Sequence, residues 1–275
     1  MVRELAFAKL NLVLHVGRPR DDGLHPLCSL FASIDLADEV SAEARESGED
    51  TVDCRGVPGD NLASRALADF RARAGRGLPP LALTIDKRIP VAAGLGGGSA
   101  DAAAALRIAN GLAREPLARE ELLRLAADLG SDVPSQLDPG HALVQGAGER
   151  VESLGLPPFA AVLVPDEEGL PTGAVYAELD RIEGWRERLD PEPLRALAAC
   201  GSAEELATGL QNDLQPPALS LRPELEERLH GLREAGALGA AVSGSGPTCF
   251  GLFANRSEAD AAAATLPGAL VAEPR

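Results

Sequence analysis

A glycine-rich segment that runs straight into a helical pattern is the strongest chemical signal in this 275-residue sequence. Between Gly94 and Gly98 every residue except Leu95 is glycine, and Ser99 then opens an alanine-rich stretch. Glycines let the backbone adopt positive φ angles and approach a ligand closely, and the amides at a helix start attract anions. The segment therefore predicts a loop that binds phosphate groups.

Two familiar nucleotide-binding loops match this segment poorly. A Walker A loop ends in Gly-Lys-Ser/Thr, whereas Ser99 is followed here by Ala100 and Asp101. A dinucleotide-binding loop has a glycine where this chain has Ser99, and an acidic residue that ends a second strand; Glu120 and Glu121 lie in a helical pattern instead. A flexible turn without a ligand is the remaining alternative, and the helix that follows directly argues against it.

Transfer of a phosphoryl group to an alcohol also needs a base for the hydroxyl and a cation for the spreading negative charge. Lys9 lies within an apolar strand pattern, and Asp132 precedes a short helix in the segment Gly-Ser-Asp-Val-Pro at 130–134. Each residue also has a structural interpretation, because Lys9 could protect an edge strand and Asp132 could cap a helix. Sequence spacing alone does not bring the two together.

Two further segments leave alternatives open. The glycine-rich stretch 242–248 lies between two strand patterns and predicts either a tight hairpin or a second loop that closes over phosphates. Asn212, Asp213 and Leu214 precede a pair of prolines, which is compatible with a simple helix end.

The elements that must position these residues follow from hydrophobic periodicity. We expect strands at 5–16, 27–36, 38–44, 81–85, 141–145, 160–165, 240–243 and 248–253. We expect helices at 61–75 with Gly75 closing it, 100–112, 120–129, 172–179, 192–199 and 223–235, one that Ser202 opens with Glu205, and a last one capped by Ser257. Because strands and helices alternate without a strict βαβ rhythm, the pattern favours an α+β fold. The Gly- and Pro-rich stretch 154–158 suggests two domains, 1–156 and 157–275.

Composition excludes several classes of protein. The formal charge of −16 disfavours nucleic acid and anionic membranes as partners, although a local pocket can still bind a nucleotide. Four widely spaced cysteines argue against a zinc site and a disulfide framework. The N-terminus has no secretory signal, and the uncharged window 235–255 is broken by five glycines and a proline, so we expect a soluble cytoplasmic protein.

Taken in order along nearly the whole chain, these segments resemble the GHMP kinase superfamily. The resemblance rests on segments 8–12, 22–25, 90–101, 129–134, 170–172, 212–214 and 243–247. The Asp-Gly-Leu-His turn at 22–25 and the Asn-Asp-Leu segment are similar to the branch that acts on a cytidine diphosphate-linked methylerythritol in the non-mevalonate isoprenoid pathway. The implied fold has an N-terminal ribosomal protein S5 domain 2-like half and a C-terminal ferredoxin-like half, with the substrate pocket between them.

The resemblance also implies a role for individual residues. Asp132 would deprotonate or orient the substrate hydroxyl, and Lys9 would stabilise the aspartate and the transferring phosphoryl. The substrate would contact Asn11, His25, Asp132, Pro171, Thr172 and Tyr176, with His25 at the cytosine edge and Tyr176 against the base. ATP would contact Pro90, Gly94, Leu95, Gly96, Gly97, Gly98, Ser99 and Asp101. Mg²⁺ is expected with ATP; its protein ligands stay open, with Ser99 and Asp101 as candidates, and so does the oligomeric state.

Departures from the family pattern at Leu24, Pro26 and Ala100 and two alternatives accompany the resemblance. Leu24 stands where the branch has a second aromatic residue against the cytosine, which weakens base binding by ~1–3 kcal/mol if stacking on one side is lost. Another GHMP kinase, acting on homoserine, mevalonate or a sugar, is one alternative, and His25 and Tyr176 argue against it because those substrates carry no base. An inactive nucleotide-binding member is the other, and the presence of both Lys9 and Asp132 argues against it.

Overall fold

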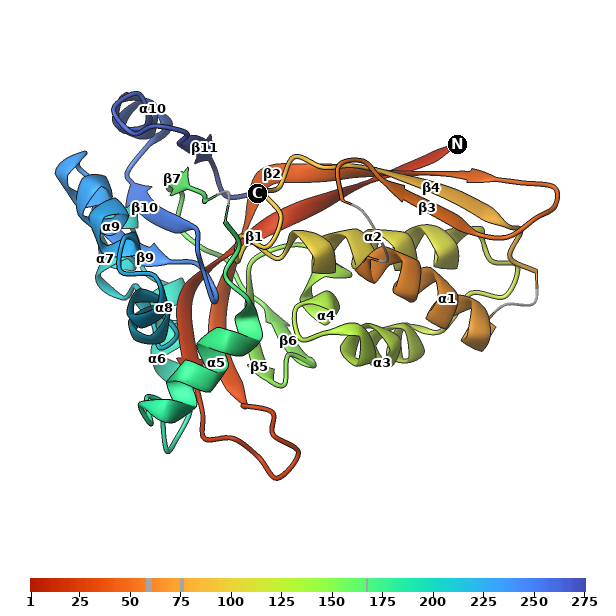
Figure 1. Ribbon diagram of the computed structural model, residues 1–275, viewed down its shortest axis with the longest axis horizontal. Coiled ribbons are helices and arrows are strands. Elements are labelled where there is room, and N and C mark those ends of the chain that lie inside the picture. The colour runs from red at the N-terminus through yellow and green to blue at the C-terminus, as the bar shows by residue number, and fades with distance from the viewer. Residues whose placement is uncertain (58–60, 75–76, 167) are drawn as a thin grey trace.

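A computed structural model describes residues 1–57, 61–74, 77–166 and 168–275. Among these residues, seven strands form the larger of two sheets, in the order β3-β4-β2-β1-β8, with β5 paired to β2 and β6 paired to β5. The strands are β1 Val2–Val16, β2 Leu27–Ala44, β3 Thr51–Cys54, β4 Leu81–Asp86, β5 Ala142–Gly146, β6 Arg150–Ser153 and β8 Gln211–Asn212. Four helices lie on one side of this sheet, α1 Leu62–Ala74, α2 Gly97–Leu112, α3 Arg119–Leu129 and α4 Val133–Gln136, with α2 against the strands and α3 packed on α1 and α4 (Figure 1).

The smaller sheet is antiparallel, in the order β11-β7-β10-β9. Its strands are β7 Ala160–Val164, β9 Gly239–Val242, β10 Cys249–Phe253 and β11 Leu270–Ala272. The helices of this part are α5 Thr172–Arg181, α6 Glu192–Ala198, α7 Ala203–Thr208, α8 Gln215–Leu221, α9 Leu225–Glu234 and α10 Arg256–Ala263. Strand β8 belongs to this later part of the chain but pairs in parallel with β1, so it links the two parts.

Strand β2 is one continuous element, so the expectation of two strands at 27–36 and 38–44 is wrong. Its first half pairs with β5 and its second half with β4, while β1 accompanies it along its length. Asp38, which interrupts the apolar pattern, is fully buried because Lys87 and the amides of Arg88 and Ile89 bond its carboxylate. Since the charge is satisfied inside the protein, it does not end the strand.

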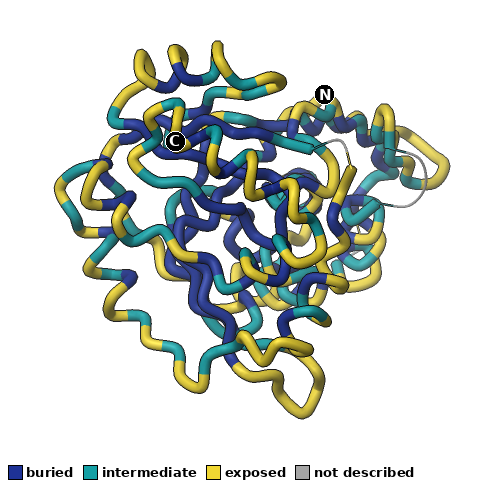
Figure 2. Tube along the Cα trace, turned by 60° about the vertical axis from the view of Figure 1, so that its left-hand side comes forward, coloured by how far each residue is buried: buried dark blue, intermediate teal, exposed yellow. Residues whose placement is uncertain are grey.

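Buried residues run through the middle of the molecule and across both sheets (Figure 2). One core cluster lies between the larger sheet and helices α1 to α4, and α2 contributes a run of alanines to it. Small side chains let α2 approach both β1 and α1 closely, which explains how a chain with 3% aromatic residues fills its core. A second cluster contains Leu10 and Leu30 from the larger sheet together with Leu163 and Phe250 from the smaller one.

Most other expected elements are present, with a few corrections. Strands β3, β6, β8 and β11 and helix α8 were not expected from the sequence. Ser202 caps α7 as expected, by accepting a bond from the Glu205 amide, but α10 is capped by Asn255 and not by Ser257. Gly75, the expected end of α1, lies outside the described residues.

The four cysteines are free, and no helix in the described ranges has the length and apolar character to cross a bilayer.

Candidate active site

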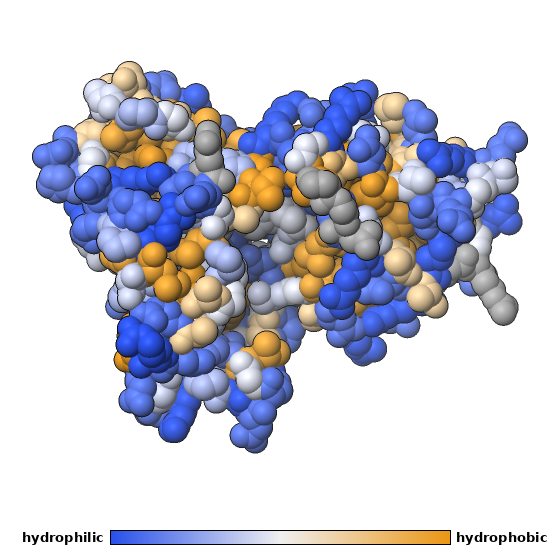
Figure 3. Space-filling view, in the orientation of Figure 1, coloured by the Kyte–Doolittle hydropathy of each residue, from blue (hydrophilic) through white to orange (hydrophobic). Residues whose placement is uncertain are grey.

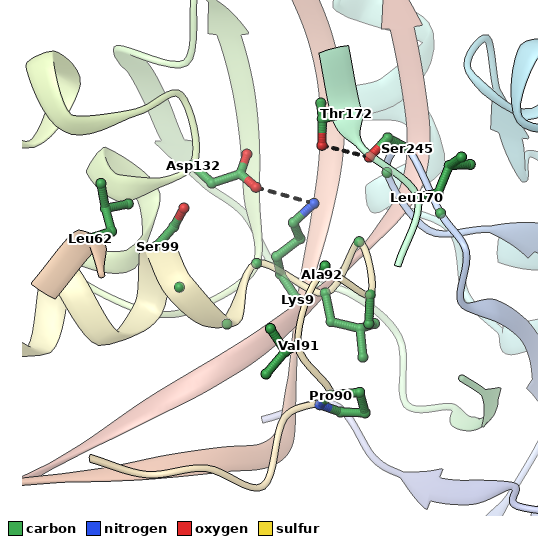
Figure 4. Close-up of a pocket in the computed structure, with 18 of the residues that line it drawn as sticks. Lys9, Leu62, Pro90, Val91, Ala92, Ser99, Asp132, Leu170, Thr172 and Ser245 are labelled. Atoms are coloured by element: carbon green, nitrogen blue, oxygen red, sulfur yellow. Dashed lines mark hydrogen bonds and ion pairs between the residues drawn. The ribbon is translucent and has the colours of Figure 1, made fainter. Parts of the chain in front are cut away.

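A cavity of about 560 Å³ opens between the two parts of the molecule. Figure 3 shows the surface hollowed near its middle, and Figure 4 shows the side chains that face this space. Segments far apart in the sequence contribute to its lining, among them strand β1, the loop 90–99, the entry to α4, the start of α5, and the connection between β9 and β10. The expected catalytic and phosphate-binding residues therefore meet in one place.

The glycine loop forms the N-terminal end of α2. Gly94 and Gly96 have φ angles of 76° and 72°, which glycine adopts without strain. Gly96 is the N-cap of α2, so Gly97, Gly98 and Ser99 form the first helical turn, whose amides lack intrahelical partners. A Cβ on Gly96 would lie 3.0 Å from Cγ of Lys9, so glycine is needed here for the lysine side chain to pass beside the loop.

Lys9 and Asp132 face each other across the cavity. The Lys9 Nζ lies 3.3 Å from Oδ2 of Asp132 and donates to Oδ1 of Asn11 at 2.5 Å (Figure 4). Lys9 is only 4% exposed, and its backbone amide donates to the carbonyl of Leu95, so the open edge of β1 is covered at this point. Lys9 therefore does not protect an exposed edge strand.

Asp132 occupies the N-cap position of α4, but its carboxylate makes no capping hydrogen bond to any part of the chain that the structure describes. The side chain points into the cavity toward Lys9 instead, so helix capping does not explain this residue. Ser131, which precedes it, also lines the cavity.

The second glycine-rich segment is both a hairpin and a cavity loop. It connects the antiparallel strands β9 and β10, and Gly244, Ser245 and Gly246 line the cavity. The Ser243 hydroxyl donates to the carbonyl of Gly94 at 3.1 Å, and a Cβ on Gly94 would lie 2.2 Å from the carbonyl oxygen of Ser243. The two loops thus pack directly on each other.

Asn212 fixes the second loop from behind. Its side-chain amide donates to the carbonyls of Val242 and Gly244 at 2.8 and 2.7 Å, and its Oδ1 accepts from the Leu214 amide at 2.8 Å. The interpretation of 212–214 as a helix end is wrong, because Asn212 lies in β8 and helix α8 begins after Leu214.

The start of α5 carries three residues that were expected to contact the substrate. Pro171, Thr172 and Tyr176 line the cavity, and the Thr172 hydroxyl lies 2.9 Å from that of Ser245. Burial raises the pKa of Tyr176 to about 12, with a smaller contribution from the charge of Asp132, so its phenol stays neutral at physiological pH. Asn11 also lines the cavity, on the same face of β1 as Lys9.

His25 lies beside this cavity and not in its lining. Its ring is 5.3 Å from that of Tyr176, its Nδ1 lies 2.7 Å from the carbonyl oxygen of Gly17, and its Nε2 lies 3.2 Å from Oδ1 of Asp180. Leu24 is 53% exposed, so it does not face Tyr176 across a closed slot. The expected cytosine contacts are therefore adjacent in space, with Asp180 as a neighbour that the sequence did not suggest.

Sequence reasoning missed a buried charge cluster under the glycine loop. The Lys87 Nζ lies 2.5 Å from Oδ2 of Asp38 and 2.8 Å from Oδ2 of Asp101. Burial raises the pKa of Asp101 to about 6, against the opposing effect of Lys87. Burial also lowers the pKa of Lys87, but the two carboxylates outweigh it and the pKa is raised overall. A charged residue inside an apolar strand, the signal that identified Lys9, would have identified Asp38.

The cavity also has an apolar end that was missed, formed by Cys54, Val57 and Leu62 with the amide side chain of Asn61 beside them. No sequence signal brings β3 and the start of α1 to the glycine loop. For a metal ion, the described residues contain no group of three or more His, Cys, Asp or Glu side chains that could hold one. Ser99 and Asp101 line the cavity, and Oδ1 of Asp101 has no partner among the residues described, so these two could complete the coordination of an ion carried by phosphates.

Comparison with known proteins agrees with this geometry. Residues 61–140 match the model of the GHMP kinases N-terminal domain, and residues 194–272 match that of the GHMP kinases C-terminal domain. A 4-diphosphocytidyl-2-C-methyl-D-erythritol kinase of Streptomyces avermitilis is 45% identical over 94% of this chain and 90% of its own length. The enzyme of that name from Rhodococcus jostii is 46% identical over 95% of this chain and 87% of its own length.

Solved structures give the same result. A crystal structure of 4-(cytidine 5'-diphospho)-2C-methyl-D-erythritol kinase has a TM-score of 0.82 and 36% identity, and the match covers 99% of this chain and 98% of the other. Mevalonate kinase of L. major shares the fold, with a TM-score of 0.75 at 16% identity over 100% and 96% of the two chains. The expected α+β GHMP kinase fold and the expected small-molecule kinase are thereby confirmed. The chain belongs to the 4-diphosphocytidyl-2-C-methyl-D-erythritol kinase family of the GHMP kinases.

Proposed function

We propose that this kinase transfers the γ-phosphoryl group of ATP to the 2-hydroxyl of 4-diphosphocytidyl-2-C-methyl-D-erythritol, the compound in its relatives' names, in the non-mevalonate isoprenoid pathway. One observation carries the proposal: buried Lys9 and half-buried Asp132 form an ion pair in the same cavity that the glycine loop lines. An alcohol between the carboxylate and the loop would lie beside the terminal phosphate of a bound nucleotide. We also propose that the protein is cytoplasmic.

The residues present account for each part of this reaction. The first turn of α2 would hold the ATP phosphates, and the apolar end of the cavity at Cys54, Val57 and Leu62 would hold the adenine. Asp132 would orient the hydroxyl and take its proton as the new oxygen–phosphorus bond forms and the bond to ADP breaks. Lys9 would hold the Asp132 carboxylate in position and neutralise charge on the transferring group. Positioning of this kind supplies ~7–11 kcal/mol.

Substrate selection would lie on the opposite wall. Tyr176 is half-buried and lines the cavity, where its ring could stack on a base, and Pro171 and Thr172 line the same cavity. His25 next to Tyr176 would read the base edge. We propose two domains, 1–156 and 157–275, with this pocket between them; the chain passes from the larger to the smaller sheet between β6 and β7. Mg²⁺ bound to the ATP phosphates would neutralise their charge, with Ser99 and Asp101 as candidate protein ligands.

The test is the activity of Asp132→Ala with ATP and a panel of alcohols: the cytidine diphosphate-linked methylerythritol, homoserine, mevalonate and a sugar. We expect the wild type to release ADP rapidly only with the cytidine compound, and the variant to lose about 10²- to 10⁴-fold in kcat while its Kd for ATP changes little. Asp138→Ala is the control, because this carboxylate is 71% exposed and pairs with Arg119 on the surface. Near-normal turnover by a folded Asp132→Ala protein would remove that residue from the mechanism, and turnover of homoserine or mevalonate instead would reassign the substrate.

A further inference from the structure

We propose that Ser29 is a positioning residue for phosphoryl transfer, which sets the orientation of the Asn11 amide and through it the position of the Lys9 ammonium. The inference rests on the proposed function of Lys9. Ser29 does not line the cavity, and its side chain is fully buried in strand β2 behind the catalytic pair. It acts through a chain of hydrogen bonds and not by contact with a substrate.

This series of hydrogen bonds runs from the cavity into the larger sheet. Lys9 Nζ donates to Oδ1 of Asn11 at 2.5 Å, Nδ2 of Asn11 donates to Oγ of Ser29 at 2.9 Å, and the Ser29 hydroxyl donates to the backbone carbonyl of Val13 at 2.5 Å. Lys9, Asn11 and Ser29 are each at most 4% exposed. The bonds therefore act without competition from bulk water, which strengthens them.

The direction of these bonds is fixed at the inner end. A backbone carbonyl can only accept, so the single proton of the Ser29 hydroxyl is committed to Val13. The hydroxyl oxygen can then only accept from Asn11, which must present its NH₂ group to Ser29 and its carbonyl oxygen to Lys9. A flipped amide would place an NH₂ group against the ammonium, two donors facing each other, with neither bond formed.

This arrangement of hydrogen bonds leaves one N–H group of the Lys9 ammonium for the transferring phosphoryl group. An ammonium has three N–H donors, of which one is directed to Asn11 and one lies toward Asp132. The third is available for an oxygen of the transferring phosphoryl group. Two irregularities in the pairing of β1 with β2, between Phe7 and Lys9 and between Asn11 and Val13, bracket the segment that carries both side chains. Bulges of this kind re-aim side chains next to active sites.

Strand β2 also contains a serine that lacks such a role. Ser33 is 2% exposed and lies four residues after Ser29, but its hydroxyl has no hydrogen-bond partner in the ranges that the structure describes. Burial in β2 therefore does not by itself give a serine hydroxyl a hydrogen-bond partner. Ser33→Ala is a matched control for Ser29→Ala: the same substitution, in the same strand, at nearly the same burial.

The first experiment compares kcat and KM of these two variants. We expect Ser29→Ala to lower kcat on the order of 10²-fold, because the freed amide displaces the ammonium by about 1 Å, while KM for ATP stays within about twofold. Ser33→Ala should retain wild-type kcat, and Ser29→Thr should recover most of the activity because it keeps the hydroxyl. Equal kcat values for Ser29→Ala and Ser33→Ala would overturn the inference.

The second experiment asks whether Ser29 acts through Asn11. In an Asn11→Ala background, Ser29→Ala should cause no further loss of kcat, since the group that it orients is already gone. A full additional loss would assign Ser29 another role and overturn the inference. If the wild type turns over none of the alcohols, the proposed function fails instead. The hydrogen-bond series from Ser29 to Lys9 can then still be tested by the same double-mutant cycle on the free energy of unfolding. Strictly additive effects of Ser29→Ala and Asn11→Ala on that free energy would refute the inference.

Discussion

Oppositely charged residues in this protein form two clusters, one on either side of the glycine loop. Lys9 lies between Asp132 and Asn11, and Lys87 lies between Asp38 and Asp101. A buried charge is costly unless partners bond it, so each of these side chains holds its neighbours in place. The first cluster faces the reacting groups, while the second fixes the segment that leads into the loop.

Asp101 should make the stability of the protein depend on pH in an unusual direction. Its pKa is raised by burial from the ordinary value of 3.8 to about 6. Between about pH 4 and pH 6 the folded state therefore retains a proton that the unfolded state has released, so this group lowers the free energy of unfolding as pH rises. A shift of about two units corresponds to at most about 3 kcal/mol.

Urea unfolding of wild type and Asp101→Asn at pH 4.5 and pH 7 measures this contribution. Because asparagine does not titrate, the variant should gain stability relative to wild type between these two pH values, by up to about 2 kcal/mol. A relative loss over the same interval would mean that Lys87 outweighs burial and that the carboxylate ionises more readily in the folded protein.

At the scale of elements, we expect ATP binding to depend on the contact between the two glycine loops. Gly94 has a φ of 76°, and a Cβ there would lie 2.2 Å from the carbonyl oxygen of Ser243 and 2.9 Å from that of Gly246. Both are backbone atoms, so neither can move without displacing its loop. We expect Gly94→Ala to lower kcat/KM for ATP on the order of 10²-fold, since small displacements of positioning groups cost this much.

Gly268→Ala is the control for Gly94→Ala. Gly268 has a similar φ of 69°, but nothing lies within 4 Å of the position of its added Cβ. This variant should lose roughly 1–2 kcal/mol of stability from backbone strain and keep its activity. If both variants lose only stability, contact between the loops is not required for ATP use.

The elements themselves could largely be predicted from the sequence, whereas their junctions could not. Helices α1, α2, α3 and α9 follow from periodicity and their end signals, and β1 follows from alternation. Strands β3, β6, β8 and β11 are two to four residues long, too short to show a period, and exist only because a neighbour supplies hydrogen bonds. The expected break between 27–36 and 38–44 is absent, because Asp38 is bonded by Lys87, which is distant in sequence.

The same distinction holds for the site. Lys9, Asp132 and the glycine loop were identified by residue type, and they do share a cavity. Ser29 and Lys87 could not be identified in this way, because a serine in a strand or a lysine after one carries no signal until the fold supplies its partners. The position of His25, beside the lining and next to Asp180, also depends on the packing of α5 against the turn at 22–25.

At the scale of the whole molecule, the two sheets are joined by a common core. The cluster that contains Leu10 and Leu30 from the larger sheet also contains Leu163 and Phe250 from the smaller one. The C-terminal residues add a second link, because the Asp35 amide donates to the carbonyl of Glu273. The active-site cavity lies along the same junction, so rigidity of the junction sets the distance between Asp132 and the second loop.

We therefore expect the protein to unfold in one transition, although chains of this size often unfold domain by domain. Trp185, the single tryptophan, reports on the part that carries α5 and α6, while far-UV circular dichroism reports on the whole chain. Because exposing either side of the shared core exposes the other, the two signals should have the same midpoint in urea, and ATP should raise both midpoints equally. A tryptophan midpoint at lower urea than the circular dichroism midpoint would contradict this. It would mean that the C-terminal part unfolds while the N-terminal part stays folded, so that the shared core does not couple the two.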